Sequence, residues 1–149
     1  FKRFWDAETG APRHRRARAV GGRCGRGIRT FSPDSRRCLE RGLKDATVQL
    51  WDAVTRTPLV KLEGHTKVAC WVWSHDGARV MTGSWDGTAR LWDANTGRLL
   101  KTLTWRDGAI FSCAFSADGA RVATSSWTMA RLWNAKTGAL LTTLEGHTD

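Results

Sequence analysis

The sequence predicts an all-β protein made of four-stranded antiparallel units, and three observations lead to this prediction. A short motif recurs around Trp5, Trp51, Trp92 and Trp133, with spacings of 46, 41 and 41 residues. Each repeat holds four short segments of strand-like composition that are separated by turn residues. No segment shows the apolar period of a capped helix. Four strands in about 41 residues is the size of one blade of a β-propeller.

The clearest unit begins at Val68, and its expected strands follow one another along the chain. Residues 68–73 form a continuous apolar run, which suits a strand that is covered on both faces. Asp86-Gly87 is a strong signal for a tight hairpin between two strands. We therefore expect strands at residues 68–73, 79–84, 88–92 and 98–103, with turns at 74–77, 86–87 and 95–97.

Other parts of the chain keep the same phase. The turn sequence at 74–77 recurs at 116–119 and, more loosely, at 32–35. The fold class predicted is therefore a partial β-propeller, with about two complete blades, one degenerate blade and two partial ends. The expected units are residues 1–10 (the end of a preceding blade), 11–57 (a degenerate, Arg-rich blade), 58–103 and 104–144 (regular blades) and 145–149 (the start of a further blade).

Three blades leave open sheet edges and exposed apolar faces, which favour aggregation. We therefore expect a fragment of a larger propeller. On this interpretation, the protein needs either its own missing blades or further copies of the chain to close the ring.

The repeated motif resembles that of the WD-repeat (WD-40) β-propeller family, and especially the highly regular bacterial WD-repeat proteins. Gly64-His65 is followed about 27 residues later by Trp92-Asp93, and Gly-His returns at residues 146–147. The resemblance is close from residue 45 onward, is recognisable at 1–10 and 31–36, and fails over 11–30. It implies blades of a ring that usually has about seven of them.

The resemblance also implies a hydrogen-bonded chain of side chains inside the best blade. Its members here are His65, Ser84, Asp86 and Trp92, with Thr82 as the second choice for the hydroxyl. A buried indole N–H needs an acceptor, and a hydroxyl can accept from it and donate onward to an imidazole. A His, a Ser and an Asp also invite comparison with a hydrolase. No oxyanion donor or nucleophile elbow accompanies them, so we predict no catalytic residue and no enzyme activity.

Two units depart from this pattern. In the last full unit, Trp105-Arg106 stands in place of Gly-His, and the hairpin at 127–129 lacks both Asp and Gly. In the first unit, Asp45 and Trp51 are present, but the expected His is not. Neither unit can therefore build the full network.

Residues just before the hairpin Asp often contact partners in the family. Here they are Lys44, Trp85 and, by analogy, Trp127. Exposed Trp is typical of binding hot spots, which makes these three residues the candidate site for a protein or peptide partner. The alternative is that the two Trp pack against adjacent loops. Three further Trp, at 71, 73 and 105, are interpreted as core or inter-blade residues.

The net charge of +10 is concentrated in one segment. Residues 11–41 hold ten Arg and only two acidic residues, which leaves little net charge for the rest of the chain. Three interpretations stay open for the anomalous part at 11–30. It is a blade read in a shifted frame, a divergent loop, or a basic arm that contacts nucleic-acid phosphates. Nucleic-acid binding is the least favoured, because no aromatic residue precedes Phe31 in this segment.

The four cysteines, at 24, 38, 70 and 113, form no Cys-x-x-Cys pair. Their spacing suits neither a zinc site nor a disulfide framework, so we expect buried free thiols, no metal and no cofactor. Free thiols favour a reducing compartment, and the expected location is cytoplasmic. No run approaches the roughly 18 apolar residues of a membrane helix, so no membrane contact is predicted.

These observations favour a non-catalytic scaffold for protein–protein interaction. The resemblance offers one alternative, a regulatory or targeting propeller in a multidomain bacterial signalling enzyme. In such enzymes, the propeller follows a kinase or a caspase-like peptidase domain, which is absent from these residues.

Overall fold

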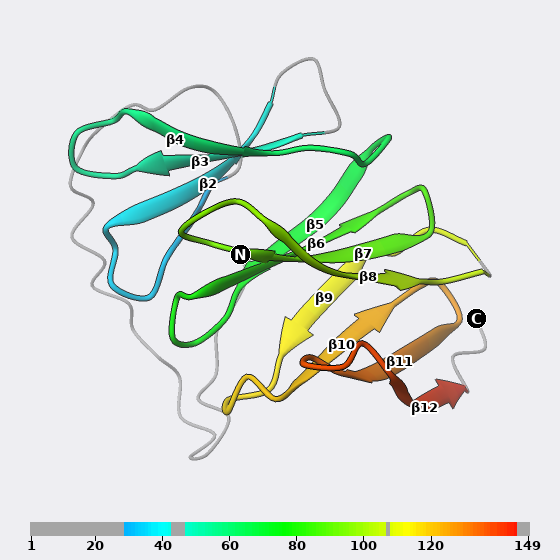
Figure 1. Ribbon diagram of the computed structural model, residues 1–149. Helices are drawn as coiled ribbons and strands as arrows, with labels where there is room; N and C mark the ends of the chain where they lie inside the picture. Colours follow the sequence, from blue (N-terminus) through cyan, green and yellow to red (C-terminus); the bar gives the residue numbers. More distant parts are fainter. Residues whose placement is uncertain (1–28, 43–46, 107, 146–149) are drawn as a thin grey trace, which may run out of the picture.

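The computed structural model describes residues 29–42, 47–106 and 108–145 (Figure 1). The predicted unit at residues 1–10 and most of the Arg-rich segment lie outside the described residues. The described residues form twelve strands. These are β1 (Arg29–Phe31), β2 (Arg37–Arg41), β3 (Val48–Asp52), β4 (Pro58–Leu62), β5 (Val68–Trp73), β6 (Arg79–Ser84), β7 (Thr88–Asp93), β8 (Leu99–Thr104), β9 (Ser112–Phe115), β10 (Arg121–Ser125), β11 (Met129–Asn134) and β12 (Leu140–Glu145).

The strands form three four-stranded antiparallel sheets, which lie side by side in Figure 1. Each sheet takes four consecutive strands in chain order: β1 to β4, β5 to β8 and β9 to β12. We call these sheets the first, second and third blades. The strands that begin the blades meet one another, because β5 contacts both β1 and β9. The predicted all-β fold with four-stranded blades is confirmed.

The second blade matches its expected strands to within one residue at each end. The boundaries between blades differ from the predicted units, however. Strand β4 pairs with β3, so residues 58–62 belong to the first blade although the predicted unit begins at 58. Likewise, β12 extends to Glu145, one residue into the predicted final unit. The boundaries differ because the fourth strand of each blade pairs with the third strand, which carries the repeated Trp, and so belongs to the blade before the predicted boundary.

The first blade is more complete than its sequence leads one to expect. Residues 37–41 lack the repeat motif, yet they form β2 and pair with β3. The reason is apolar burial, since Leu39 lies opposite Leu50 and both side chains are buried. Strand β1 pairs with β2 through Arg29, Thr30 and Phe31, which completes the four strands of the first blade.

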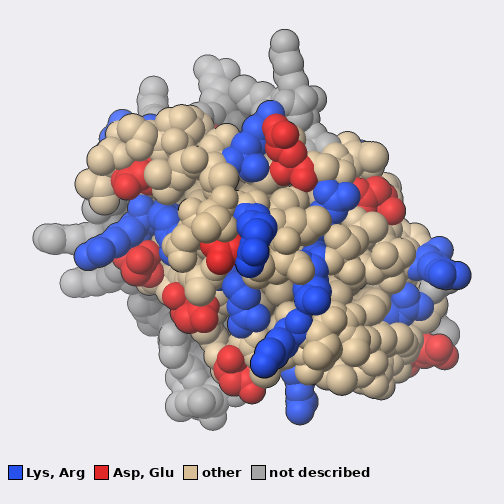
Figure 2. All heavy atoms as spheres, in the orientation of Figure 1, with Lys and Arg blue, Asp and Glu red and all other residues tan. Residues whose placement is uncertain are grey.

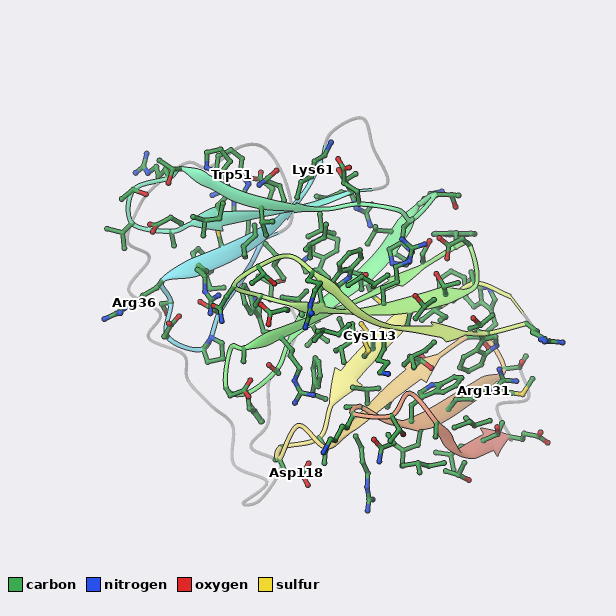
Figure 3. The ribbon with its side chains drawn as sticks, in the orientation of Figure 1. Arg36, Trp51, Lys61, Cys113, Asp118 and Arg131 are labelled. Atoms are coloured by element: carbon green, nitrogen blue, oxygen red, sulfur yellow. The ribbon has the colours of Figure 1, made fainter. Side chains whose placement is uncertain are left out.

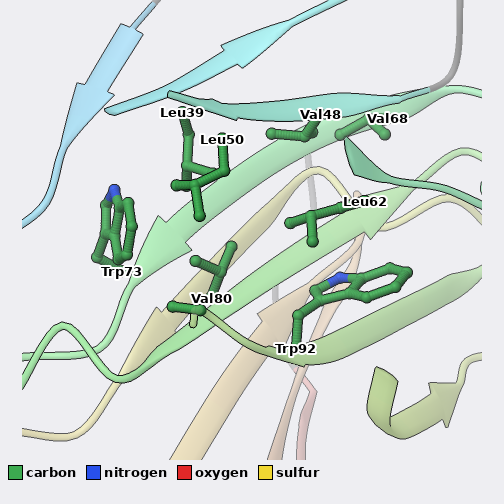
Figure 4. Close-up of a cluster of buried hydrophobic side chains, with 9 residues drawn as sticks. Leu39, Val48, Leu50, Leu62, Val68, Trp73, Val80 and Trp92 are labelled. Carbon is green, nitrogen blue, oxygen red and sulfur yellow. The ribbon is translucent and has the colours of Figure 1, made fainter. Parts of the chain in front are cut away.

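The apolar cores lie between the blades. One core joins Leu39 and Leu50 of the first blade to Val80 and Trp92 of the second (Figure 4). Alternate residues of the second blade, such as Met81, face a second core shared with the third blade. This follows from the alternation of side chains along a strand, which gives a central blade two buried faces. Stacking of neighbouring blades therefore provides most of the buried apolar surface.

Two arginines at equivalent positions tie neighbouring blades together. Arg37, at the start of β2, donates from Nη2 to the carbonyl of Gly77 at 2.8 Å. Arg79, at the start of β6, donates in the same way to the carbonyl of Gly119 at 2.7 Å. The Arg37 guanidinium also lies 5.2 Å from the Trp73 ring centroid, within cation–π range. Part of the positive charge of the sequence therefore serves inter-blade packing.

Candidate functional site

A continuous hydrogen-bonded chain of side chains runs through the second blade. Trp92 Nε1–H donates to Thr82 Oγ1 at 2.9 Å, and that oxygen lies 2.8 Å from His65 Nε2. His65 Nδ1 lies 2.9 Å from Asp86 Oδ2. The ionised Asp86 carboxylate can only accept, so the proton of the neutral imidazole is on Nδ1 and is donated to Asp86. Nε2 is then an acceptor, and the Thr82 hydroxyl, which accepts from the indole, donates its own proton to Nε2. Every polar atom along this path then has a partner.

The hydroxyl of the chain is that of Thr82, and this corrects the first choice of Ser84. Ser84 Oγ instead donates to the carbonyl of Lys67 at 2.8 Å and accepts the Asp86 backbone N–H at 3.1 Å. Both hydroxyls lie on the same face of β6. Trp92 is paired with Val80, so Thr82 is two residues from the position opposite Trp92 and Ser84 is four residues from it. A strand rises about 3.3 Å per residue, so Ser84 lies roughly 7 Å beyond Thr82 and out of reach of the indole.

The electrostatics of this chain fit a structural role. Burial alone would raise the pKa of Asp86, but hydrogen bonds from Thr88 and His65 outweigh it and hold the pKa far below its usual value. Burial lowers the pKa of His65, against the opposing effect of Asp86. At neutral pH the pair is a carboxylate beside a neutral imidazole. The hydroxyls of Thr82 and Ser84 are fully buried, so neither can reach a substrate as a nucleophile.

The other two blades hold only parts of this arrangement. In the third blade, Trp133 Nε1–H donates to Thr124 Oγ1 at 2.9 Å, which reproduces one link. In the first blade, Glu40 stands at the register position of Thr82. The buried Trp51 Nε1–H has no hydrogen-bond partner within the described residues. These differences follow the sequence, which lacks the corresponding His in both blades.

Two of the three predicted partner-binding residues lie together on the surface. Trp85 precedes the β6–β7 hairpin and is 49% exposed, and Trp127 in the β10–β11 turn is 78% exposed. Phe111 lies between them, with its ring centroid 5.1 Å from that of Trp85 and 4.4 Å from that of Trp127. Lys67 Nζ lies 4.5 Å from the Trp85 centroid. We call Lys67, Trp85, Phe111 and Trp127 the aromatic surface.

The aromatic surface draws on two blades, which a repeat pattern alone does not reveal. Lys67 and Trp85 flank strands of the second blade, whereas Phe111 and Trp127 flank strands of the third. The rings contact one another, as the packing alternative expected, and yet both Trp remain exposed. Phe111 is absent from the candidate site predicted from the sequence. The repeat offered a signal for it, because Phe111 stands where the second blade has the small residue Ala69. The third predicted residue, Lys44, lies outside the described residues.

The remaining Trp interpreted as inter-blade residues do lie between blades. Trp71 Nε1–H donates to Thr30 Oγ1 and Trp73 Nε1–H to the Thr30 carbonyl, both at 3.1 Å and both from β5 to β1. Trp105 is buried, with the Arg131 guanidinium 4.4 Å from its ring centroid.

Described arginines of the basic segment contact the protein itself. Arg41 Nη2–H donates to the Val68 carbonyl, and Arg29 lies 3.8 Å from a carboxylate oxygen of Glu40. Arg36, by contrast, points away from the sheets at their edge (Figure 3). On the face shown in Figure 2, basic and acidic side chains are interspersed and form no single basic patch.

Among the described cysteines, Cys38 is fully buried, and Cys70 and Cys113 are free thiols. Cys70 and Cys113 pack against the core between the second and third blades and are less completely buried than Cys38. In the part of the chain that the structure describes, no three His, Cys, Asp or Glu side chains gather as metal ligands. The same residues include no helix with the length and apolar character to cross a membrane.

Comparison with known proteins finds the WD40 family, described as "WD domain, G-beta repeat", at residues 56–93 and 97–134. Autophagy-related protein 16 of Arabidopsis thaliana is 32% identical over an alignment of 123 positions that covers 81% of this chain and 23% of that protein. Human angio-associated migratory cell protein is 35% identical over 85 residues, which are 57% of this chain and 20% of that protein. Human WD repeat and SOCS box-containing protein 1 is 33% identical over an alignment of 101 positions that covers 61% of this chain and 24% of that protein.

The chain thus spans about a quarter or less of the length of these relatives. They come from a plant and a mammal, so they give no support to the specifically bacterial likeness. The two family matches cover just over half of the chain and coincide with the repeated Trp motifs that end β7 and β11. The chain therefore belongs to the WD40-repeat family.

Proposed function

We propose that this chain is a non-catalytic scaffold that binds a protein or peptide through its aromatic surface. Proteins of the WD40-repeat family generally mediate protein–protein interactions, and that general role is the starting point. A rigid set of blades presents loops at one end, and binding residues are commonly found on such loops. The fold does not identify the partner, so the proposal depends on the surface itself.

One observation carries the proposal: Trp85 and Trp127 remain exposed while Phe111 joins them into one surface. Large aromatic side chains supply much contact area at little cost in conformational entropy, which is why they dominate binding hot spots. Lys67 places a positive charge on the Trp85 ring, and this favours a partner that carries an acidic residue beside an apolar one. A peptide with an acidic and an apolar anchor fits this chemistry.

The proposal can be tested with a random peptide library displayed on phage and selected on the immobilised chain. We expect selected peptides to bind at least about fivefold more weakly to Trp85→Ala and Trp127→Ala, which corresponds to about 1 kcal/mol. The melting temperature of both variants should change little. Val54→Ala is the control, because Val54 is 79% exposed and lies in the first blade, away from the aromatic surface.

Two outcomes would count against the proposal. One is that both Trp variants keep full affinity for the selected peptides. The other is that Trp85→Ala loses stability and affinity together, which would make Trp85 a packing residue.

Two other functions suggested by the sequence, a targeting module of a signalling enzyme and nucleic-acid binding, have less support. A role as the targeting module of a larger signalling enzyme concerns domains outside these residues. Nucleic-acid binding through the basic segment finds little support in Arg29, Arg37 and Arg41, because all three contact protein groups. A cytoplasmic location is likewise proposed only from the cysteine pattern of the sequence.

A further inference from the structure

Two thiols from different blades face each other across the inner strands. Cys70 on β5 and Cys113 on β9 have their Sγ atoms 3.2 Å apart. In Figure 3, Cys113 lies centrally, where the second and third blades meet. The two residues do not occupy equivalent repeat positions, since Cys70 corresponds to Ser112 and Cys113 to Trp71. Their meeting is therefore a property of this chain and does not follow from the repeat.

The surroundings make room for this pair. A β-carbon on residue 83 would lie 2.6 Å from Cys70 Sγ, so only Gly83 leaves space for the thiol. Cys70 is the less buried of the two thiols, so a small oxidant reaches Cys70 first. A disulfide bond is about 2.0 Å long, so the two sulfur atoms need to approach by only about 1 Å. Side-chain rotation supplies a movement of that size.

We propose that Cys70 and Cys113 form a reversible disulfide that joins the second and third blades when the chain meets a hydroperoxide. Cys70 is the attacking residue. A hydrogen bond from the Cys113 thiol is the main cause that lowers the pKa of Cys70, whereas the pKa of Cys113 is raised by that same contact and by burial. The thiolate is the reactive form, so oxidation begins at Cys70.

The chemistry proceeds in two balanced steps. The Cys70 thiol first releases its proton, and the thiolate then attacks the terminal oxygen of the hydroperoxide. The O–O bond breaks and sulfenic acid forms at Cys70, while the alkoxide, or hydroxide from hydrogen peroxide, takes up the released proton and leaves as an alcohol or water. Cys113 sulfur then attacks the Cys70 sulfur and displaces hydroxide, which takes the Cys113 proton and leaves as water. Two thiols are oxidised and one hydroperoxide is reduced. A dithiol reductant restores both thiols.

The cross-link has a structural consequence that can be measured. It joins residues that are 43 positions apart in the chain, and closing such a loop restricts the unfolded state. The oxidised chain should therefore unfold at a higher urea concentration than the reduced chain, and a dithiol should reverse the shift. Because Lys67 directly precedes β5 and Phe111 directly precedes β9, the disulfide would fix the two halves of the aromatic surface relative to each other.

Peptide mapping tests the proposal directly. Trypsin places each of the four cysteines in its own peptide, at residues 24–26, 38–41, 68–79 and 107–121. The reduced chain is treated with hydrogen peroxide, free thiols are blocked with N-ethylmaleimide, and the digest is analysed by mass spectrometry. We expect peptide 68–79 linked to 107–121, with a mass two hydrogens below their sum, and loss of the link after reduction.

Variants and an unfolded control sharpen the result. Cys38→Ser should keep the link, whereas Cys113→Ser should leave a sulfenic acid at Cys70 that dimedone captures. Oxidation in concentrated urea should scatter the links among all four cysteines, because the fold no longer selects the pair. The proposal is overturned if the folded chain gives no link between these two peptides, or if it links Cys70 to Cys24 or Cys38 as often as to Cys113.

Discussion

Thr82 links two buried side chains, Trp92 and His65, through hydrogen bonds of its hydroxyl to both. Its hydroxyl accepts from the Trp92 indole and lies within hydrogen-bond distance of the His65 imidazole. A buried polar group without a partner costs about 1–3 kcal/mol, so one hydroxyl here satisfies two such groups. The chain of contacts ends on Asp86, which fixes the hairpin through the Thr88 backbone N–H at 2.9 Å.

At this scale we predict that Thr82→Val lowers the free energy of unfolding by about 1–3 kcal/mol, because the shape is kept while two partners are lost. Urea melts measure the change. In a Trp92→Phe background the loss should be smaller, since one of the two partners is already gone. Equal losses in both backgrounds would mean that Thr82 and Trp92 are not coupled.

The sequence alone could name the network but not its hydroxyl. Residues 82 and 84 are both hydroxyl-bearing and share one face of a strand, so spacing admits either. The choice depends on which residue of β6 is opposite Trp92, and that register is a tertiary property. Phe111 was missed for a similar reason, because its neighbours Trp85 and Trp127 come from different blades.

At the scale of single elements, the turn between the first two strands of each blade is built in the same way three times. Ser74 Oγ–H donates to Asp76 Oδ1, and that carboxylate accepts the Ala78 backbone N–H. The turn closes with Gly77 at a φ of 68°, and the first blade has Ser35 there at 61°. A left-handed conformation is strained for residues other than Gly, so this copy of the turn carries a cost.

We therefore predict that Ser35→Gly raises the free energy of unfolding by about 0.5–1 kcal/mol. Gly77→Ser is the matched reverse change and should lower it by a similar amount. A β-carbon at 77 would make only ordinary contacts, the nearest being Pro33 Cδ at 3.4 Å, so crowding does not confuse the comparison. Opposite signs in paired urea melts are the expected result, and a loss of stability in both variants would contradict it.

Most elements of the regular blades could be predicted from the sequence because apolar runs and Asp-Gly or Ser-x-Asp-Gly turns repeat in phase. The strand β2 could not, since residues 37–41 carry two Arg, a Glu and a Cys and show no clean alternation. Burial between two blades decides that element. The boundary at Leu62 was also hidden, because strand pairing and sequence repeat follow different phases.

At the scale of the whole molecule, one apolar face of the third blade is exposed. The corresponding faces of the first and second blades are each covered by the next blade, and no described residue covers this one. Leu62, Leu103 and Leu144 occupy equivalent places in β4, β8 and β12. They are 3%, 3% and 59% exposed, because the next blade packs on the first two only. The open face has the same chemistry as the buried faces between blades.

We predict that this 149-residue chain self-associates through the open face of the third blade. Sedimentation velocity over a concentration series should show species larger than the 16.6 kDa monomer. Leu144→Lys should shift the distribution toward monomer, whereas Leu59→Lys, a similar change at another exposed leucine, should not. A monomer at every concentration, or an equal effect of both substitutions, would contradict this prediction.

The aromatic surface belongs to the same scale, because it exists only when the second and third blades are stacked. Nuclear magnetic resonance of the indole N–H groups of the nine Trp tests it most directly, with a peptide selected as described above as the ligand. The signals of Trp85 and Trp127 should shift on addition of the peptide. Those of Trp92 and Trp133 should stay in place, because both are buried and bonded to threonine hydroxyls. Unchanged Trp85 and Trp127 signals, with binding observed elsewhere, would contradict the proposed binding surface.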